Sequence, residues 1–394
     1  MMSMVKKSLQ LELCNFMQEL NLKELKYVTN SAYNQARMKI KPEIFKHFVT
    51  ELNESFYTNN DERVTLWNGF RLLACDGSFL NLPFVPAIVE KFGALTNQHD
   101  TEVLNGRCTI LYDVENNIIL NGGLASYKIG EREMLLTILK DTRKHNFNDL
   151  IILDRGYPSF DLVYEFKKRK SDVLIRLKPK YSLAIEKFYE SNEQDVVIEL
   201  QPGRGMSFFK KLYNKKTTIL IRLIKVVLES GEIELLMTTL LDAEKFPLSI
   251  FKELYFKRWG IETLFDKLKN KLKIELFTGY SEISIMQDFY CTLFISNIQS
   301  LLVSEANDEL KSQNITNKKY LYKVNTNLSI GFLKTRIIEL FSKNNKTENT
   351  LLELEKLFLK TLVPIRPGRS FERDTYKYRA RKKPAVTKNF KNAL

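Results

Sequence analysis

The stretch Tyr255–Lys269, which reads YFKRWGIETLFDKLK, carries two patterns on one predicted helix. We expect this helix to run from about Ser249 to about Lys273, because apolar residues recur there every three or four positions. These apolar residues are Leu254, Ile261, Leu264, Phe265, Leu268 and Leu272. A second face is predicted to carry Tyr255, Arg258, Glu262 and Lys269. On spacing alone, the usual interpretation of such a row is a ladder of surface ion pairs.

Two short apolar runs upstream each end in an aspartate with a glycine close behind it. Phe70–Cys75 leads into Asp76, and Leu150–Leu153 leads into Asp154. Each run is typical of a buried strand that stops at a turn. An aspartate there can simply cap the turn, but the carboxyl ends of strands are also where open α/β sheets hold catalytic groups.

Taken together, these motifs resemble those of a large family of bacterial insertion-sequence transposases. The pattern Tyr-x2-Arg-x3-Glu-x6-Lys is similar to the family's YREK signature, and the residues around Asp76 and Asp154 are similar to its two aspartate motifs. The resemblance covers most of the chain from about Gly69 to Phe277. It implies an α/β fold with a ribonuclease H-like catalytic core, interrupted by an antiparallel β insertion and flanked by helical N-terminal and C-terminal regions.

The resemblance also implies a catalytic triad of Asp76, Asp154 and Glu262 that binds metal. Three carboxylates within a few ångströms repel one another unless a cation is present. Two Mg²⁺ ions about 4 Å apart would activate water or a 3′-hydroxyl and stabilise the leaving oxygen, and Mn²⁺ could substitute for them. We expect Asp76 to bridge both ions, with Asp154 and Glu262 each holding one.

The remaining residues of the signature are expected to contact DNA. Arg258, Lys269 and the hydroxyl of Tyr255 could hold phosphates on either side of the cut. Trp259 could stack on an unpaired base, or it could be an ordinary core aromatic. Further candidates near the site are Glu131, Arg132 and Arg155.

Composition favours a polyanionic partner. The 394 residues include 61 Lys and Arg against 47 Asp and Glu, a net charge of +14. For a folded chain this surplus favours nucleic acid. The resemblance implies that the partner is double-stranded DNA, namely the transposon's terminal inverted repeats and the target, with a homodimer on DNA. No apolar run approaches the roughly 18 residues that a membrane span needs, so we expect a cytoplasmic protein of the bacterial nucleoid.

Other kinds of catalytic site have little support in this sequence. The four cysteines are far apart, and no two of the three histidines lie near each other, which argues against a zinc site or a Ser-His-Asp triad. Neither a phosphate-binding glycine loop nor a nucleophile elbow occurs. Enzymatic chemistry must therefore come from carboxylates, which bind hard divalent cations.

The chain divides into three predicted regions. Residues 1–65 form a helical domain that either binds DNA or only packs on the core. Residues 66–345 form the catalytic domain, in which the basic β insertion at about 178–245 could clamp DNA or present a solvated face. Residues 346–394 form a C-terminal helix and a basic tail, which could follow a nucleic-acid backbone or only aid solubility.

Two other functions remain open at this point. One is a metal-dependent, structure-specific nuclease on the same fold, which would cut DNA without joining it. The other is a non-enzymatic DNA-binding protein, in which the row around Glu262 is a structural ladder of ion pairs.

Overall fold

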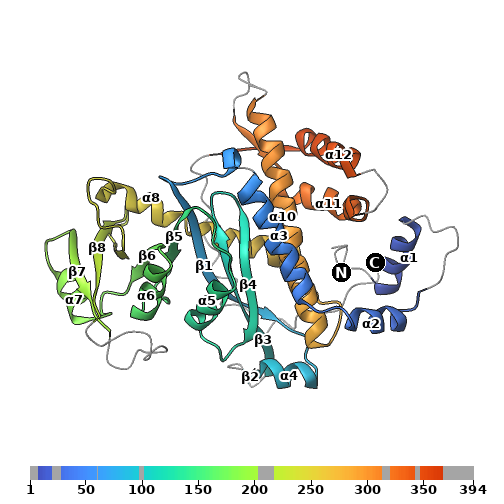
Figure 1. The fold of residues 1–394 in the computed structure, drawn as a ribbon, viewed down its shortest axis with the longest axis horizontal. Coiled ribbons are helices and arrows are strands. Elements are labelled where there is room, and N and C mark those ends of the chain that lie inside the picture. Colours follow the sequence, from blue (N-terminus) through green and yellow to red (C-terminus); the bar gives the residue numbers. More distant parts are fainter. Residues whose placement is uncertain are drawn as a thin grey trace.

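A mixed β-sheet of nine strands forms the centre of the protein in a computed structural model (Figure 1). The structure describes residues 8–19, 28–59, 61–96, 102–202, 217–312, 320–341 and 347–366. The strands of the large sheet are β1 Phe70–Asn81, β2 Ala94–Thr96, β3 Glu102–Asp113, β4 Ile118–Ser126, β5 Asn148–Leu153, β6 Asp172–Leu177, β7 Asp195–Leu200, β8 Ile219–Val227 and β9 Ile233–Thr238. A separate pair consists of β10 Tyr322–Val324 and β11 Leu362–Pro364.

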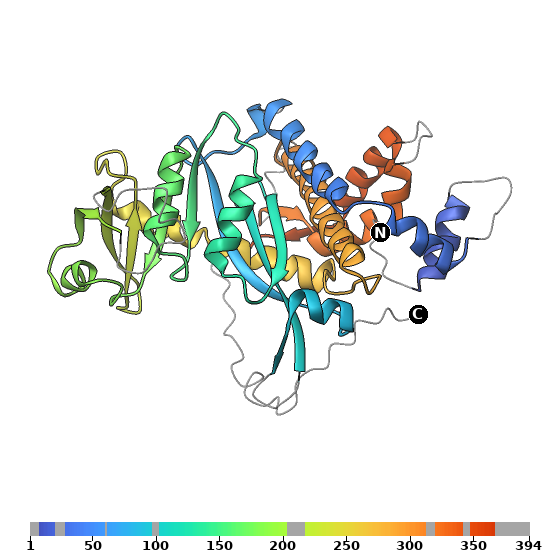
Figure 2. The same cartoon turned by 60° about the horizontal axis from the view of Figure 1, so that its bottom comes forward.

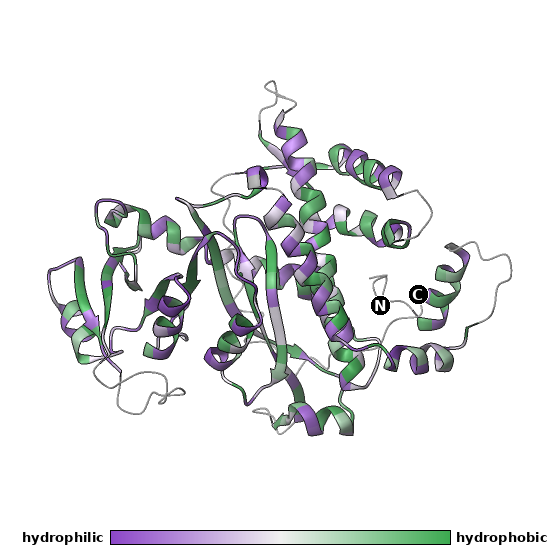
Figure 3. Cartoon of the chain, viewed as in Figure 1, coloured by the Kyte–Doolittle hydropathy of each residue, from purple (hydrophilic) through white to green (hydrophobic). Residues whose placement is uncertain are grey.

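Helices cover this sheet and extend from it. They are α1 Leu9–Glu19, α2 Asn30–Met38, α3 Glu43–Asn59, α4 Pro86–Phe92, α5 Glu131–Lys140, α6 Phe160–Lys168, α7 Leu183–Glu190, α8 Phe251–Phe256, α9 Trp259–Asp266, α10 Glu282–Ser312, α11 Thr326–Phe341 and α12 Thr347–Lys360. Figure 3 shows hydrophobic residues concentrated in the central strands, whereas peripheral helices such as α12 alternate hydrophobic and hydrophilic residues. None of the described helices is long and apolar enough to cross a membrane.

The order and direction of the core strands confirm the expected fold class. β4, β3 and β1 form an antiparallel meander. β1 then pairs in parallel with β5, and β5 in parallel with β6. An antiparallel meander whose first strand continues into parallel strands is the ribonuclease H-like arrangement. The parallel strands are buried on both faces, which explains why β5 is a continuous apolar run without alternation.

The expected antiparallel insertion extends the same sheet. β9 pairs antiparallel with β6, and β8 and β7 follow it toward the edge. In both orientations (Figures 1 and 2) these strands lie at one end of the molecule, with α7 beside them. Residues 203–216 of the expected insertion lie outside the described residues.

Two basic residues of this insertion are turned into the protein. Arg222 is fully buried, where its Nε donates to Asp195 Oδ1 at 2.7 Å and its Nη1 donates to the Phe246 carbonyl at 2.8 Å. Lys225 is also buried and donates to the Ser191 carbonyl. Neither side chain is available to clamp DNA, because both are already bonded within the fold.

The N-terminal residues are helical, as expected, but α3 shares the core of the region that follows. Asn53 donates to the carbonyls of Ile119 and Leu120 on β4, and accepts a hydrogen bond of 2.9 Å from Asn297 on α10. Figures 1 and 2 both show α3 beside α10. The boundary drawn at residue 65 therefore passes through packed core. The basic tail from residue 367 onward lies outside the described residues.

The single helix expected at about 249–273 is broken into segments, so that prediction is wrong in detail. A 3₁₀ turn at Leu248–Ile250 precedes α8, and a π-helical turn at Lys267–Lys271 follows α9. Between α8 and α9, the N–H groups of Arg258 and Gly260 bond to carbonyls three residues earlier, which tightens the backbone.

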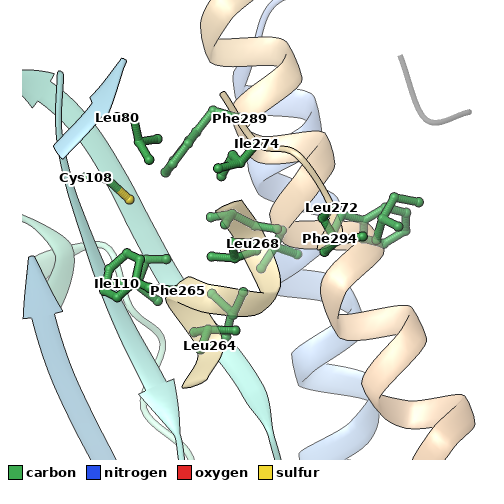
Figure 4. Close-up of a cluster of buried hydrophobic side chains, with 14 of the residues drawn as sticks. Leu80, Cys108, Ile110, Leu264, Phe265, Leu268, Leu272, Ile274, Phe289 and Phe294 are labelled. Atoms are coloured by element: carbon green, nitrogen blue, oxygen red, sulfur yellow. The ribbon is translucent and has the colours of Figure 1, made fainter. Parts of the chain in front are cut away.

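The apolar stripe of this segment is nevertheless buried as predicted. All six of its residues are less than 9% exposed. In Figure 4 the side chains of Leu264, Leu268 and Leu272 fill the space between the sheet and α10. The segmented helix therefore packs against the sheet on one side and α10 on the other, and this packing fixes the position of its polar face.

Candidate functional site

The two aspartates lie at the same level of neighbouring parallel strands. In the pairing of β1 with β5, Ala74 lies opposite Ile152, and each aspartate follows two residues later. Because side chains alternate along a strand, Asp76 and Asp154 point to the sheet face that also carries Ala74 and Ile152. Parallel strands are about 4.8 Å apart, so the two carboxylates are close neighbours.

β1 does not end at Asp76, and the turn predicted there is wrong. The strand continues to Asn81 because β3 stays paired with it, with Asp76 opposite Ile110. The pairing of β1 with β5 stops at Ala74, so Asp76 lies where these two strands separate. The chain leaves β5 at Asp154, whose Oδ1 accepts a 2.7 Å hydrogen bond from the Gly156 N–H.

Asp76 lies where its negative charge is disfavoured. Burial, together with the nearby charges of Asp154 and Glu131, raises the pKa of Asp76 to about 6. The N–H of Gly77, which donates to Asp76 Oδ1 at 2.8 Å, and the guanidinium of Arg258 act in the opposite direction. Because burial is the largest of these effects, the charged form of Asp76 is chiefly disfavoured by poor solvation.

Arg258 connects the sheet to the segmented helix. Its Nη2 lies 2.7 Å from Glu262 Oε1, and its Nη1 lies 3.8 Å from Asp76 Oδ2. The guanidinium also lies over the rings of Tyr255 and Trp259, with distances to the ring centroids of 5.9 and 5.4 Å. The structure therefore brings Asp76, Arg258 and Glu262 together.

The two aromatic residues beside Arg258, Tyr255 and Trp259, have different surroundings. Tyr255 is buried with Leu254 and Phe251 in a cluster that also includes Ile152, and burial raises its pKa to about 12. Trp259, in contrast, is 42% exposed beside Arg258. An exposed indole next to the carboxylates suits base stacking better than it suits a core role.

Lys269 reaches a different part of β1. Its Nζ donates to the carbonyl of Phe79 at 2.7 Å, three residues beyond Asp76. The π-helical turn that contains Lys269 changes the phase of the helix between Glu262 and this lysine. The four signature residues consequently do not form the straight row that regular helical spacing predicts.

Glu131, a weaker candidate from the sequence, lies against both aspartate motifs. A Cβ built on Gly77 would lie 3.1 Å from Glu131 Oε1, and one built on Gly156 would lie 3.4 Å from Glu131 Oε2. Both glycines therefore leave room for this carboxylate at the start of α5. Next to it, Arg132 Nε donates to the Gly156 carbonyl at 3.1 Å, whereas Arg155 is exposed.

Arg107 belongs to this arrangement and was not identified from the sequence. Its Nη1 lies 2.7 Å from Glu131 Oε1, and its guanidinium lies over the Phe79 ring at 4.7 Å. Phe79 and Arg107 are paired residues of β1 and β3. Only the register of these two strands reveals the contact, since Arg107 lies in no recognisable local motif.

The donor types of this site suit a divalent cation. Carboxylate oxygens are the preferred ligands of Mg²⁺, and a cation would relieve the repulsion that Asp76 experiences. As the side chains lie, no three His, Cys, Asp or Glu residues in the described part of the chain are close enough to hold a metal ion. Glu262 is turned to Arg258, so metal binding by all three acidic residues would require Glu262 to exchange that partner.

Comparison with known proteins places these observations in a family. A family model described as "Transposase DDE domain" matches residues 67–298, which include Asp76, Asp154 and Glu262. Transposase InsG for insertion sequence element IS4 of Escherichia coli (strain K12) is 22% identical over 249 residues. That alignment covers 63% of this chain and 54% of the relative, so the chain spans about half the length of the curated relative it matches.

A solved structure, that of the piggyBac transposase synaptic complex with hairpin DNA, has a TM-score of 0.40 and 12% sequence identity to this chain. The match covers 78% of this chain and 60% of the piggyBac chain, a likeness too low to carry an argument. The family model, in contrast, matches more than half of the chain and includes the point where β1 and β5 separate. The chain therefore belongs to the family of transposases with a DDE domain, whose members depend on a divalent metal.

Proposed function

We propose that this protein is a DNA transposase that cuts DNA at transposon ends and joins those ends to target DNA. The observation that carries the proposal is the placement of Asp76 and Asp154 at one level of the sheet, with Arg258 and Glu262 across from them. Cleavage and joining are both attacks on a phosphodiester, so one carboxylate site can serve both reactions.

In this proposal Asp76, Asp154 and Glu262 would hold two Mg²⁺ ions, and these would supply the activation of a water or 3′-hydroxyl and the stabilisation of the leaving oxygen. Asp76, whose burial raises its pKa, would be stabilised in its charged form by a neighbouring cation. Arg258 keeps Glu262 in place before the metal binds and becomes free to bind a phosphate once Glu262 turns away. A planar guanidinium suits a two-point contact of this kind.

Contacts with DNA are assigned to residues around this site. The exposed Trp259 is assigned to stacking on an unpaired base, and Lys269 to a phosphate beyond Phe79. Tyr255 is assigned a supporting role, because it is buried and its ring lies beside the Arg258 guanidinium. The net charge of +14 supports terminal inverted repeats and target DNA as partners, and we propose that a homodimer forms on them.

Cleavage of a labelled duplex that carries the element's terminal repeats tests this proposal. We expect nicking with Mg²⁺ and none with EDTA, and we expect Glu262→Gln to abolish nicking while it leaves DNA binding intact. Glu229→Gln is the matched control, because Glu229 is exposed and pairs with Lys252 on the surface. Equal cutting by Glu262→Gln and the wild type would refute the site.

Strand transfer separates a transposase from a nuclease on the same fold. A duplex with a pre-cut transposon end is incubated with a supercoiled plasmid. Joining of the end to the plasmid is the expected result, and cleavage without joining would favour the nuclease instead.

A further inference from the structure

A cavity of about 480 Å³ lies beside the π-helical turn, away from the carboxylates of the proposed active site. Its walls come from α9, the β3–β4 turn, α10 and the segment around β10. Glu262 does not line it, although Thr263 of the next helix position does. Five basic side chains line this cavity: Arg63, Lys267, Lys271, Lys311 and Lys323.

The cations of this cavity outnumber the carboxylates that could neutralise them. Lys311 pairs with Asp308 at 2.8 Å, and Arg63 pairs with Glu305 at 2.9 Å. Glu115, the other carboxylate in the lining, lies 2.7 Å from Lys257, outside the cavity. The three remaining lysines, at 267, 271 and 323, have no carboxylate within ion-pair distance among the described residues.

Lys267 is the deepest of these lysines. Its Nζ donates to the Ser296 carbonyl at 3.1 Å and to Ser300 Oγ at 3.0 Å, which are both neutral acceptors. An ammonium has three N–H groups, so these two bonds leave one for a ligand. Burial and the charge of Lys271 lower the pKa of Lys267 to about 7. A bound anion would raise this pKa again, because it stabilises the charged ammonium.

Lys267 and Lys271 are four residues apart on the π-helical segment and line the same cavity. The Leu272 N–H bonds to the Lys267 carbonyl, which widens this turn by one residue compared with an α-helix. Lys323 reaches the cavity from the other side and is exposed. Positive charge thus continues from the buried end of the cavity to the surface, where an extended polyanion could reach it.

We propose that this cavity binds a phosphate group of the DNA backbone, with Lys267, Lys271 and Lys323 as its counter-ions. The proposal rests on the proposed function in so far as DNA is the polyanion. A phosphate fits because it is small, carries charge at physiological pH and accepts hydrogen bonds from several ammonium groups at once. The cavity would then anchor DNA at a second point on the other side of α9.

Binding of a labelled duplex over a series of KCl concentrations tests the DNA assignment. Lys267→Met, Lys271→Met and Lys323→Gln are compared with Lys46→Met, a control on α3 where Lys46 pairs with Asp141. We expect each cavity variant to weaken binding and to reduce the slope of log K against log salt by about 1, whereas the control leaves both unchanged. Lys271 and Lys323 are not fully buried, so their variants keep the test valid even if Lys267→Met fails to fold.

A second arm uses inorganic phosphate as the probe, with thermal unfolding as the readout. Stabilisation of the wild type but not of Lys271→Met would support the phosphate site. Stabilisation by phosphate together with an unchanged salt slope would overturn the assignment to DNA, and no effect in either arm would overturn the site itself. Cleavage is not needed for either readout, so a protein that binds in this way but cuts nothing would refute only the proposed function.

Discussion

The raised pKa of Asp76 links stability to pH at the proposed active site. Its carboxyl titrates at about 6 in the folded protein, chiefly because of burial, against 3.8 for an unperturbed group. Between these values the folded chain binds more protons than the unfolded chain, so stability falls as pH rises from about 4 to about 6. Above pH 6 the full penalty is present, on the order of 2–3 kcal/mol for a shift of this size.

We therefore expect Asp76→Asn to stabilise the metal-free protein near neutral pH, because the amide removes the buried charge. At about pH 4, where Asp76 is protonated in the folded state and roughly half ionised in the unfolded state, most of this penalty is absent and the substitution should stabilise much less. Thermal unfolding in EDTA at about pH 7.5 and about pH 4 measures the difference. Asp113, whose pKa burial also raises to about 6, contributes equally to the wild type and the variant. An equal stabilisation at both pH values would contradict this account.

Gly77 makes room for Glu131 beside the aspartates. The backbone of β1 is ordinary there, so alanine is expected to suit the strand. The added Cβ would, however, lie 3.1 Å from both Cγ and Oε1 of Glu131. We expect Gly77→Ala to move Glu131 or β1 by a few tenths of an ångström and to reduce cleavage by about tenfold.

A double-mutant cycle shows whether this effect comes from crowding. Cleavage by Gly77→Ala/Glu131→Ala is compared with cleavage by Glu131→Ala alone. If Glu131 is the residue displaced, alanine at 77 has no further effect once Glu131 is shortened. A tenfold loss that persists without Glu131 would assign the effect to the strand instead.

At the scale of elements, Gly260 sets how closely α9 approaches the β3–β4 turn. In an ordinary helix Gly→Ala stabilises by about 1 kcal/mol. Here the new Cβ would lie 2.7 Å from Val114 Cγ1, and overpacking of this kind costs about 1–3 kcal/mol. We expect crowding to outweigh helix propensity, so that Gly260→Ala lowers the melting temperature. In a Val114→Ala background, which removes the obstacle, the same change should raise it.

The sequence predicted the helices and strands better than it predicted the contacts between them. The strand before Asp154 was predicted from its apolar run alone, because burial on both faces leaves a local signal. The continuation of β1 past Asp76 depends on its pairing with β3, which no nearby residue encodes. The breaks around α8 and α9 were not predicted, because the apolar residues of this segment keep a helical spacing across them.

At the scale of the whole molecule, a basic side chain that the sequence suggests is on the surface can instead form a buried ion pair between distant helices. Arg37 lies in the N-terminal region that was expected either to bind DNA or to pack on the core, and it is only 2% exposed. Its Nη2 donates to Asp288 Oδ1 at 2.9 Å and to the Ser284 carbonyl at 2.8 Å. In return, Gln287 Nε2 donates to the Arg37 carbonyl at 3.0 Å. The contact joins α2 to α10 across about 250 residues, a distance that sequence patterns do not span.

Removal of the Arg37–Asp288 ion pair tests whether α2 unfolds together with the core. We expect Arg37→Met to cost about 3–5 kcal/mol, because it leaves the buried Asp288 charge without its cation. Arg37→Lys should also destabilise, since an ammonium cannot span the same acceptors. Arg37→Met/Asp288→Asn should recover part of the loss, because the amide removes the charge and can still accept from the Thr278 N–H.

Hydrogen exchange then locates the effect of Arg37→Met. Faster exchange confined to Asn30–Met38 would show that α2 opens by itself, as a DNA-binding attachment would. The shared packing of α3 with β4 and α10 favours the other result, in which exchange also rises along α10 and β4. The N-terminal helices would then belong to the cooperative core that positions Asp76 and Glu262. A movement of α2 on DNA would in that case be transmitted through α10 to the positions of these carboxylates. Unchanged exchange in both regions would show that the Arg37–Asp288 pair contributes little to stability.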